Sequence, residues 1–552
     1  MGAARRLYAY TVSAVSLLVL SIGVENLVSL ILAEIEAAFG SDLIGGPSTI
    51  RGQVSLAIAL VAVGTPVYGV HWWLANRGLE RADAAASADR CSAIRALYFA
   101  IVATGGLVVA AAAAARLFEG TIGTVIGDPD PGAGMQVSGE VARLLVGGVV
   151  WWTHWRRGDI DLRHDAMAAT AESLARLHRY AWAFVGLMLA VVGAGEVIQT
   201  VLSALIGRSG FGSGDRSWLG SLAASLSMLI VGLGILWLHL DDARRSIRDR
   251  AVIGADDRIS TLRAGYVSVV FLVSLAAVAF LAATATAELL RLVLGVSGAT
   301  DAAAVLELVA GPIAVALPFA VAGWLHQHLR RQEAAGVSPA ILAAADRSSL
   351  HVTAGIGLAF LAAGTAQLLG RLVEVVVGMP AQGVFVPVEL SWFVAQVAVG
   401  AVLWVPAWSA IVRRRTLDRN RERTALFARA YLYLAVGASL VAGVPSAAYS
   451  LYRLVDTALG GTTVALASDL SIPVALVIVA SIVAAYHARL LLADLRLGAG
   501  TDVDEPMAPP GVPADRPSSM HLTLRGPAGA DLGAVAKTLR DRLPPGVVLE
   551  EG

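Results

Sequence analysis

Cysteine, lysine and charge in general are scarce in this sequence of 552 residues. Cys91 is the single cysteine, which excludes an internal disulfide and a cysteine-based metal site. Lys537 is the only lysine, so the positive charge is almost wholly arginine, a bias that a GC-rich genome produces without functional cause. Charged residues make up 15% of the chain against 57% hydrophobic residues, and the mean hydropathy is +0.69. Because no water-exposed surface of this length tolerates such a composition, the sequence predicts an integral membrane protein.

Several catalytic motifs are also absent. The sequence has no Gly-x-x-x-x-Gly-Lys-Ser/Thr loop and no large soluble domain, which argues against a self-contained ATP-driven pump. His-Glu-x-x-His and Gly-x-Ser-x-Gly patterns are missing, which removes the readily recognised hydrolases. The sequence also lacks a basic surface interleaved with aromatic residues, the pattern that is typical of nucleic-acid binding. We therefore favour a protein that is not an enzyme, and we predict no cofactor, no metal and no nucleic-acid partner.

The apolar residues occur in blocks of roughly 17–25 residues, the length that a helix needs to cross about 30 Å of hydrocarbon. Arg5-Arg6 before the first block resembles a signal peptide, but no small-residue cleavage site follows, and similar starts recur inside the chain. We predict a retained first helix. The expected fold class is an all-α polytopic membrane protein of about twelve transmembrane helices, located in the bacterial inner membrane.

Two kinds of helix alternate along the chain. Helix A begins with arginine and usually tyrosine, and helix B ends with aromatic residues, usually a histidine, and then arginines. Helix A begins at Arg6-Leu7-Tyr8, Arg95 to Tyr98, Arg179-Tyr180, Arg263 to Tyr266, Arg347 with Leu350, and Arg429 to Tyr431. Such a regular spacing predicts six tandem parallel two-helix repeats. Their expected ranges are 1–90, 91–175, 176–260, 261–345, 346–425 and 426–497, and the fifth replaces the histidine.

Orientation in the membrane follows from the connecting loops. The loops from helix B to the next helix A carry arginine clusters such as Arg156-Arg157 and Arg413 to Arg415, whereas the loops from A to B are poor in arginine. Cytoplasmic loops carry an excess of lysine and arginine. We therefore predict that both termini and all B-to-A loops are cytoplasmic.

The C-terminal region departs from this pattern. Residues 498–518 are rich in proline and acidic residues, and we predict a disordered linker there. Residues 519–552 alternate like a strand, then show helical spacing, then turn at Pro544-Pro545-Gly546 into a second short apolar run. This pattern predicts a small cytoplasmic β-α-β-like segment.

The repeated ends of helix B resemble a known family. One such end contains Trp151, His154, Trp155 and Arg156. Its order is an aromatic residue, two spacer residues, a His-Trp pair and an arginine. Together with the Arg-Leu-Tyr start, this pattern is similar to that of tandem copies of an uncharacterised bacterial membrane family, domain of unknown function 5671. The resemblance covers most of residues 1–497 and implies the membrane architecture, but no activity.

Histidines and tryptophans form the first group of candidate site residues. They lie near the arginine-rich ends of the B helices: His71, Trp72, Trp151, His154, Trp155, Trp237, His239, Trp324, His326 and His487. We interpret this tier as an interfacial belt, because both side chains have apolar bodies and polar edges that suit the headgroup level. The alternative is that several imidazoles face one cavity and ligate haem or a metal, or relay protons.

Acidic residues inside the A helices form the second group. Glu25 and Glu196 lie well within apolar stretches, and Glu288 lies closer to the outer end. An ionised group in hydrocarbon costs about 2.5–3.5 kcal/mol on insertion scales, so such groups face the bundle interior and find partners. We predict a ligand-binding site in the outer half that uses these three residues. The alternative is structural ion pairing, for example between Glu288 and Arg291.

Three functions stay open on this evidence. We favour a non-enzymatic bundle that binds or transports a small or lipid-like molecule. The second is a membrane scaffold or sensor whose arginine-rich loops and residues 519–552 engage anionic lipid or a cytoplasmic protein partner. The third is a redox or haem-binding protein that uses the histidine tier.

Overall fold

The computed structural model describes residues 3–38, 47–81, 83–132, 134–164, 169–206, 216–249, 261–297, 301–335, 339–376, 385–460 and 466–501. Within them the chain forms fourteen α-helices and no β-strand. In chain order the helices are α1 (Ala3–Ala38), α2 (Pro47–Asn76), α3 (Ala84–Arg90), α4 (Ala93–Ile126), α5 (Val137–His164), α6 (Ala169–Ile206), α7 (Ser217–Asp249), α9 (Thr261–Val293), α10 (Ala302–Ala335), α11 (Pro339–Val376), α12 (Phe385–Leu417), α13 (Arg419–Thr424), α14 (Leu426–Ala458) and α15 (Leu466–Thr501).

The chain divides into two compact units, Met1–Leu492 and Ala493–Gly552. Of the second unit, the structure describes only the last turns of α15, up to Thr501. The β-α-β-like segment predicted for residues 519–552, and the part of the predicted linker beyond Thr501, lie outside the described residues.

Eleven helices of the described ranges are long and apolar enough to cross a membrane. The other long helix, α5, has 28 residues but carries Glu140 and Arg143 in its first two turns and Arg156 and Arg157 near its end. These charges lower its mean hydropathy, although its length exceeds the roughly 20 residues that a span requires. The prediction of an all-helical, multi-pass membrane protein is confirmed.

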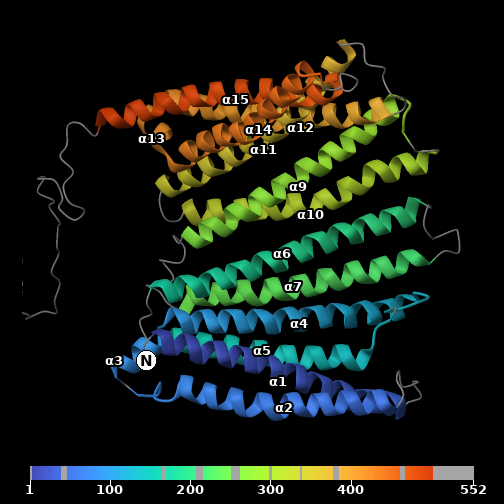
Figure 1. Ribbon diagram of the computed structural model, residues 1–552, viewed down its shortest axis with the longest axis vertical. Helices are drawn as coiled ribbons and strands as arrows, with labels where there is room; N and C mark the ends of the chain where they lie inside the picture. Colours follow the sequence, from blue (N-terminus) through green and yellow to red (C-terminus); the bar gives the residue numbers. More distant parts are fainter. Residues whose placement is uncertain are drawn as a thin grey trace, which may run out of the picture. The chain divides into compact units, whose positions relative to one another are not determined.

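Long helices that follow one another in the chain pack as antiparallel hairpins (Figure 1). They are α1–α2, α4–α5, α6–α7, α9–α10 and α11–α12. Side-chain contacts join α14 to α15 near both ends of that pair, through Tyr431 with His487 and through Arg453 with Asp469. These six pairs are called the first to sixth hairpins.

Neighbouring hairpins contact each other in a recurring manner. The first helix of one hairpin packs against the second helix of the next, as α1 does with α5, α4 with α7, α6 with α10, and α9 with α12. First helices also contact first helices, as in α1 with α4 and α11 with α14. Two short helices, α3 and α13, lie in connections between hairpins, and each begins at an aspartate cap, Asp83 and Asp418.

Small residues let the two helices of a hairpin approach closely. A Cβ atom added to Gly106 of α4 would lie 2.6 Å from the backbone nitrogen of Trp151 in α5. A Cβ atom on Gly186 of α6 would lie 2.5 Å from the backbone nitrogen of Leu236 in α7. Real Cβ atoms essentially never come so close to another backbone, so only glycine fits at these two crossings.

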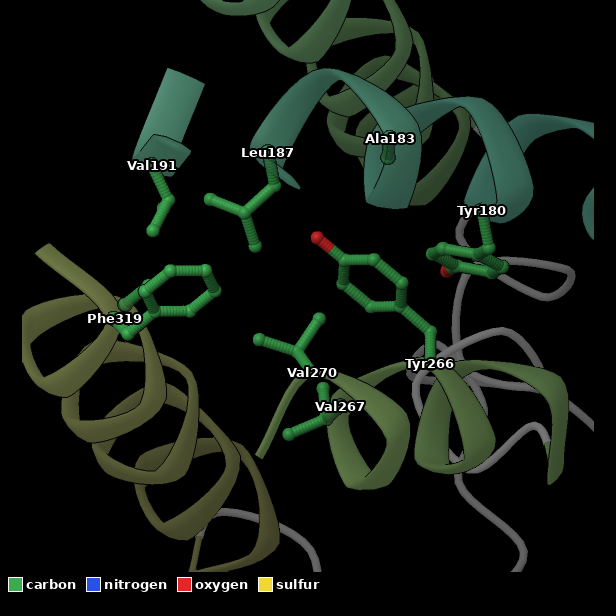
Figure 2. Close-up of a cluster of buried hydrophobic side chains, with 9 residues drawn as sticks. Tyr180, Ala183, Leu187, Val191, Tyr266, Val267, Val270 and Phe319 are labelled. Atoms are coloured by element: carbon green, nitrogen blue, oxygen red, sulfur yellow. The ribbon is translucent and has the colours of Figure 1, made fainter. Parts of the chain in front are cut away.

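Buried apolar side chains join the third and fourth hairpins (Figure 2). Tyr180 and Leu187 project from α6 and Tyr266 from α9, and Phe319 closes the cluster from α10. The rings of Tyr180 and Tyr266 stack with their centroids 5.3 Å apart. Burial of each such ring contributes most of its stabilisation through contact area and a further ~0.5–1.5 kcal/mol through ring pairing.

Candidate functional site

A tyrosine and a histidine meet at the same end of four hairpins. The tyrosine lies near the start of the first helix, and the histidine lies near the end of the second. The hydroxyl oxygen and Nε2 are 3.3 Å apart for Tyr8 and His71, 3.3 Å for Tyr98 and His154, 3.0 Å for Tyr266 and His326, and 3.3 Å for Tyr431 and His487. These contacts are called the Tyr–His pairs, and the end of the hairpins where they lie is called the Tyr–His end.

Each of these four histidines is also bonded to its own helix. Nδ1 lies 2.8 Å from the carbonyl oxygen four residues earlier in every case. A carbonyl oxygen can only accept, so Nδ1 carries the hydrogen and Nε2 of the neutral ring accepts a hydrogen bond from the tyrosine hydroxyl. Both ring nitrogens are therefore engaged, and each pair ties the two helices of its hairpin together.

The third hairpin has a different arrangement at this end. His239 faces a second histidine, His178, with ring centroids 6.3 Å apart, and its ring also stacks on Trp182 at 6.3 Å. His178 Nε2 lies 3.2 Å from the hydroxyl of Thr104 on α4, and Trp182 donates to the same oxygen at 3.1 Å. His178 and Trp182 of this hairpin thus contact the second hairpin as well.

The fifth hairpin has neither partner of a Tyr–His pair. Near the end of α12, the buried Ala407 takes the position of the paired histidine of the first, second, fourth and sixth hairpins. Trp408 follows it in the sequence. Trp408 donates from Nε1 to the hydroxyl of Tyr486 at 2.9 Å, and its ring lies 5.5 Å from that of His487. The aromatic end of the fifth hairpin therefore packs on the sixth.

The tier histidines differ in burial. His154, His239 and His487 are at most 5% exposed and lie between helices. His71 and His326 are partly exposed, although their rings contact Tyr8 and Tyr266.

The tier tryptophans occupy more varied surroundings. Trp237 and Trp324 are both 64% exposed, as an interfacial belt requires. Trp72 packs against a buried cluster that includes Tyr98, and Trp151 stacks on Trp155 at 5.7 Å. The belt interpretation of the whole tier stays a prediction.

Glu25, the first of the predicted acidic site residues, lines a polar pocket of about 590 Å³ at the end opposite the Tyr–His end of its hairpin. The pocket lies between α1, α2 and the start of α5. Arg143 of α5 reaches Glu25 at 3.2 Å and Glu140 at 2.9 Å. One guanidinium thus serves two carboxylates and joins the first hairpin to the second.

Glu196 and Glu288 lie apart from this pocket. Glu196 is exposed on α6, and the hydroxyl of Ser225 on α7 donates to it at 3.4 Å. Glu288 of α9 pairs with Arg291 of the same helix at 2.5 Å, which is the ion pairing that the sequence offered as an alternative. The pocket lined by Glu25 includes neither residue. Their joint role in one ligand site stays a prediction.

Similar ion pairs lie at the corresponding ends of the last two hairpins. In each, an arginine of the first helix contacts a carboxylate three residues later and another on the second helix. The sets are Arg371 with Glu374 and Glu389, and Arg453 with Asp456 and Asp469. Ser471 of α15 also donates to Glu374 at 2.7 Å, which links the fifth and sixth hairpins.

An apolar cavity of about 630 Å³ lies between the fifth and sixth hairpins. It is called the α11–α14–α15 cavity and is lined by α11 between His351 and Ala363, by α14 between Phe427 and Ala442, by α15 between Leu476 and Val483, and by Leu272 of α9. Alanines such as Ala359, Ala435 and Ala438 make up much of its wall, and their short side chains leave the space unfilled.

Two polar aromatic side chains of this cavity lie at one end. His351 and Tyr431 lie there with ring centroids 5.7 Å apart. The hydroxyl of Tyr431 already contacts His487 and Trp404. Farther along, the hydroxyl of Ser439 donates to a carbonyl of its own helix at 2.7 Å.

Two features of the site were not predicted from the sequence. The tyrosines were recognised only as markers of helix starts, although the joint loss of tyrosine and histidine in the fifth repeat could have indicated that they touch. The cavity was missed entirely. Its signal was the alanine-rich face of α14, where Ala430, Ala435, Ala438 and Ala442 follow helical spacing.

Among the described residues, no group of three or more His, Cys, Asp and Glu side chains is placed to hold a metal ion.

Comparison with known families gives one result. The model of the family described as "Domain of unknown function (DUF5671)" matches four times, over residues 6–129, 97–177, 176–321 and 347–482. Comparisons with curated proteins and with solved structures give no match. The repeated matches show an internal repeat and together cover residues 6–321 and 347–482. The chain therefore belongs to this family, the one that the ends of its B helices resemble.

Proposed function

We propose that this membrane protein binds a lipid-like molecule in the α11–α14–α15 cavity and that it is not an enzyme. The observation that carries the proposal is the cavity itself. Its volume of about 630 Å³ is within the range of small-molecule sites, and its wall is mostly apolar, with the rings of His351 and Tyr431 at one end. Since the helices around it are long enough to span a membrane, the molecules with access to it from the side are membrane lipids.

The proposed architecture is six tandem two-helix repeats with all first helices parallel. Support comes from a common register. Small residues occur eight positions after Tyr8, Tyr98, His178, Tyr266, Ser349 and Tyr431, at Ser16, Gly106, Gly186, Ser274, Gly357 and Ser439. Close backbone contacts in several hairpins fall at these positions. Small residues at equivalent crossings are typical of repeated membrane hairpins.

The proposed orientation places the Tyr–His end in the cytoplasmic half of a cell membrane, the inner membrane if the cell is bacterial. The arginine clusters of the B-to-A loops support it. On this orientation, the polar end of the cavity lies in the cytoplasmic leaflet, and the pocket of Glu25 lies near the outer surface.

The redox alternative is less well supported. A histidine that ligates haem iron must offer a free ring nitrogen. In the four Tyr–His pairs, Nδ1 donates to a carbonyl and Nε2 accepts from a hydroxyl. The scaffold alternative depends on the arginine-rich loops and on residues 519–552, and the latter lie outside the described residues.

The test is retention of lipid by the purified full-length protein. We expect native mass spectrometry of the wild-type protein, after detergent exchange, to show one bound lipid per chain. Ala438→Phe, which fills the cavity, should abolish that adduct. Ala448→Phe is the matched control, because Ala448 is exposed on the same helix and does not line the cavity. A wild-type chain without adduct, or equal retention by both variants, would contradict the proposal.

A further inference from the structure

The α11–α14–α15 cavity is long and narrow. Its lining runs from His351 to Ala363 on α11 and from Phe427 to Ala442 on α14, about 18 and 22 Å at 1.5 Å per residue. One leaflet of a bilayer, with its head groups, is also about 20 Å thick. A volume of about 630 Å³ spread over that length gives a mean cross-section of about 30 Å². Two alkyl chains side by side need more than that area, so the cavity suits one chain of one leaflet.

The wall of the cavity offers no counter-charge to a ligand. The described residues that line it include no arginine, lysine, aspartate or glutamate. The charged side chains that act on the ring of His351 are engaged elsewhere: Arg347 pairs with Glu422 at 2.9 Å, and Arg415 has a further interaction of its own. An ionised head group would therefore have no partner on the wall, which is costly in hydrocarbon. The wall favours an uncharged occupant.

Three side chains on the wall can form hydrogen bonds, and the hydrogen of each is already engaged within the protein. Nδ1 of His351 donates to the carbonyl oxygen four residues earlier at 2.8 Å, and Ser439 donates to a carbonyl oxygen of its own helix at 2.7 Å. The hydroxyl of Tyr431 donates to Nε2 of His487 at 3.3 Å. The wall therefore offers a ligand acceptors but no donor.

At the end of the cavity where His351 and Tyr431 lie, the acceptor is Nε2 of His351. With the hydrogen on Nδ1, Nε2 of the neutral ring accepts and cannot donate. This nitrogen has no hydrogen-bond partner among the residues that the structure describes, although the side chain is only 6% exposed. Because a buried acceptor without a donor is costly, a ligand that brings a donor to Nε2 is favoured.

We propose that the cavity takes an uncharged single-chain lipid whose head group is a hydroxyl, which donates to Nε2 of His351 while the chain is directed towards Ala442. This inference rests on the proposed function and adds the class and the direction of the ligand. An ether or ester head group can only accept, so it gains no bond from this nitrogen. The rest of the wall, largely alanine, leucine and valine, contacts the chain.

The test uses photoreactive hexadecanol, with a diazirine near the last carbon, on the full-length protein in phosphatidylcholine nanodiscs. Mass spectrometry maps the adducts, and we expect saturable labelling of α14 near Ala438 and Ala442. Unlabelled hexadecanol should compete about fivefold better than hexadecyl methyl ether, which keeps the oxygen but has no hydrogen to donate; one net hydrogen bond typically supplies that ratio. Hexadecanesulfonate, which is ionised at any working pH, should also compete less well than hexadecanol.

Two variants locate the hydroxyl group. His351→Phe keeps a ring but removes the acceptor, so it should abolish the preference for hexadecanol over the ether while labelling of the chain persists. Thr353→Val is the matched control, because it removes a hydroxyl two residues away that bonds to its own helix and does not line the cavity. The preference should be unchanged in that variant.

The outcomes separate the inference from the proposed function. Equal competition by the ether would overturn the hydroxyl class, and stronger competition by the sulfonate would overturn the uncharged class. Labelling near Phe427, or a preference that survives His351→Phe, would overturn the direction. In these cases Ala438→Phe should still abolish labelling, so the binding function would stand. If labelling is not saturable, or if Ala438→Phe leaves it unchanged, the cavity is not a lipid site and both proposals are wrong.

Discussion

The Tyr–His pair of the fourth hairpin gives a measurable contribution to stability. Tyr266→Phe removes only the hydroxyl that donates to His326 at 3.0 Å and preserves the ring that stacks on Tyr180. It leaves Nε2 of His326 without its donor. An unsatisfied buried group costs about 1–3 kcal/mol in proteins generally. Hydrogen bonds between membrane helices average about 0.6 kcal/mol and reach about 1.7.

Because His326 is only partly buried, we expect a loss of about 1 kcal/mol, or about fivefold in the unfolding equilibrium. The assay is reversible unfolding of the full-length protein in mixed micelles with increasing SDS, followed by circular dichroism. Tyr8→Phe is the matched control. The contact between Tyr8 and His71 is exposed, so the expected loss of unfolding free energy is below about 0.5 kcal/mol.

A double-mutant cycle isolates the contact. Tyr266→Phe leaves Nε2 of His326 without a donor, and His326→Leu leaves the hydroxyl of Tyr266 without that acceptor. In the double variant neither group is present. The double variant should therefore be about 1 kcal/mol more stable than the sum of the single losses predicts. Additivity within about 0.3 kcal/mol, the usual result for independent sites, would refute the assigned coupling.

Two further predictions concern the second hairpin. Gly106→Ala should destabilise the protein by about 1–3 kcal/mol in the same unfolding assay, because its Cβ would lie 2.6 Å from a backbone nitrogen of α5. Gly105→Ala, with open space around it, should be neutral or slightly stabilising, and an equal effect of both would contradict the close crossing. Arg143→Gln should cost more than Glu25→Gln, since Arg143 serves both Glu25 and Glu140 whereas Glu140 keeps Arg143 when Glu25 is neutralised. Equal losses would show that Glu140 does not depend on Arg143.

The sequence predicts much of the architecture because membrane helices obey strong local rules. Every backbone group in hydrocarbon must be bonded within its own segment, so long apolar blocks become helices. The prediction of α5, which carries Glu140 and Arg143, had a different basis. Its position between two arginine-marked ends predicted a crossing, although composition alone does not identify it as a span.

The sites depend on packing between helices and were less predictable. Glu25 was placed in a polar interior from its cost in hydrocarbon, but its partner Arg143 lies 118 residues later and no local pattern connects them. The cavity depends on the absence of side-chain volume between α11, α14 and α15, and a run of alanines in a sequence indicates close packing as readily as empty space.

The departures from the repeated pattern suggest where function lies. In a sequence whose repeats agree at several levels, positions that break the rule mark function or strain. The fifth hairpin has Ala407 where the paired histidine is expected, and His351 near the start of its first helix. That histidine contacts Tyr431 of the next hairpin and lines the α11–α14–α15 cavity. The residue that departs from the repeated pattern therefore lies at the cavity for which lipid binding is proposed.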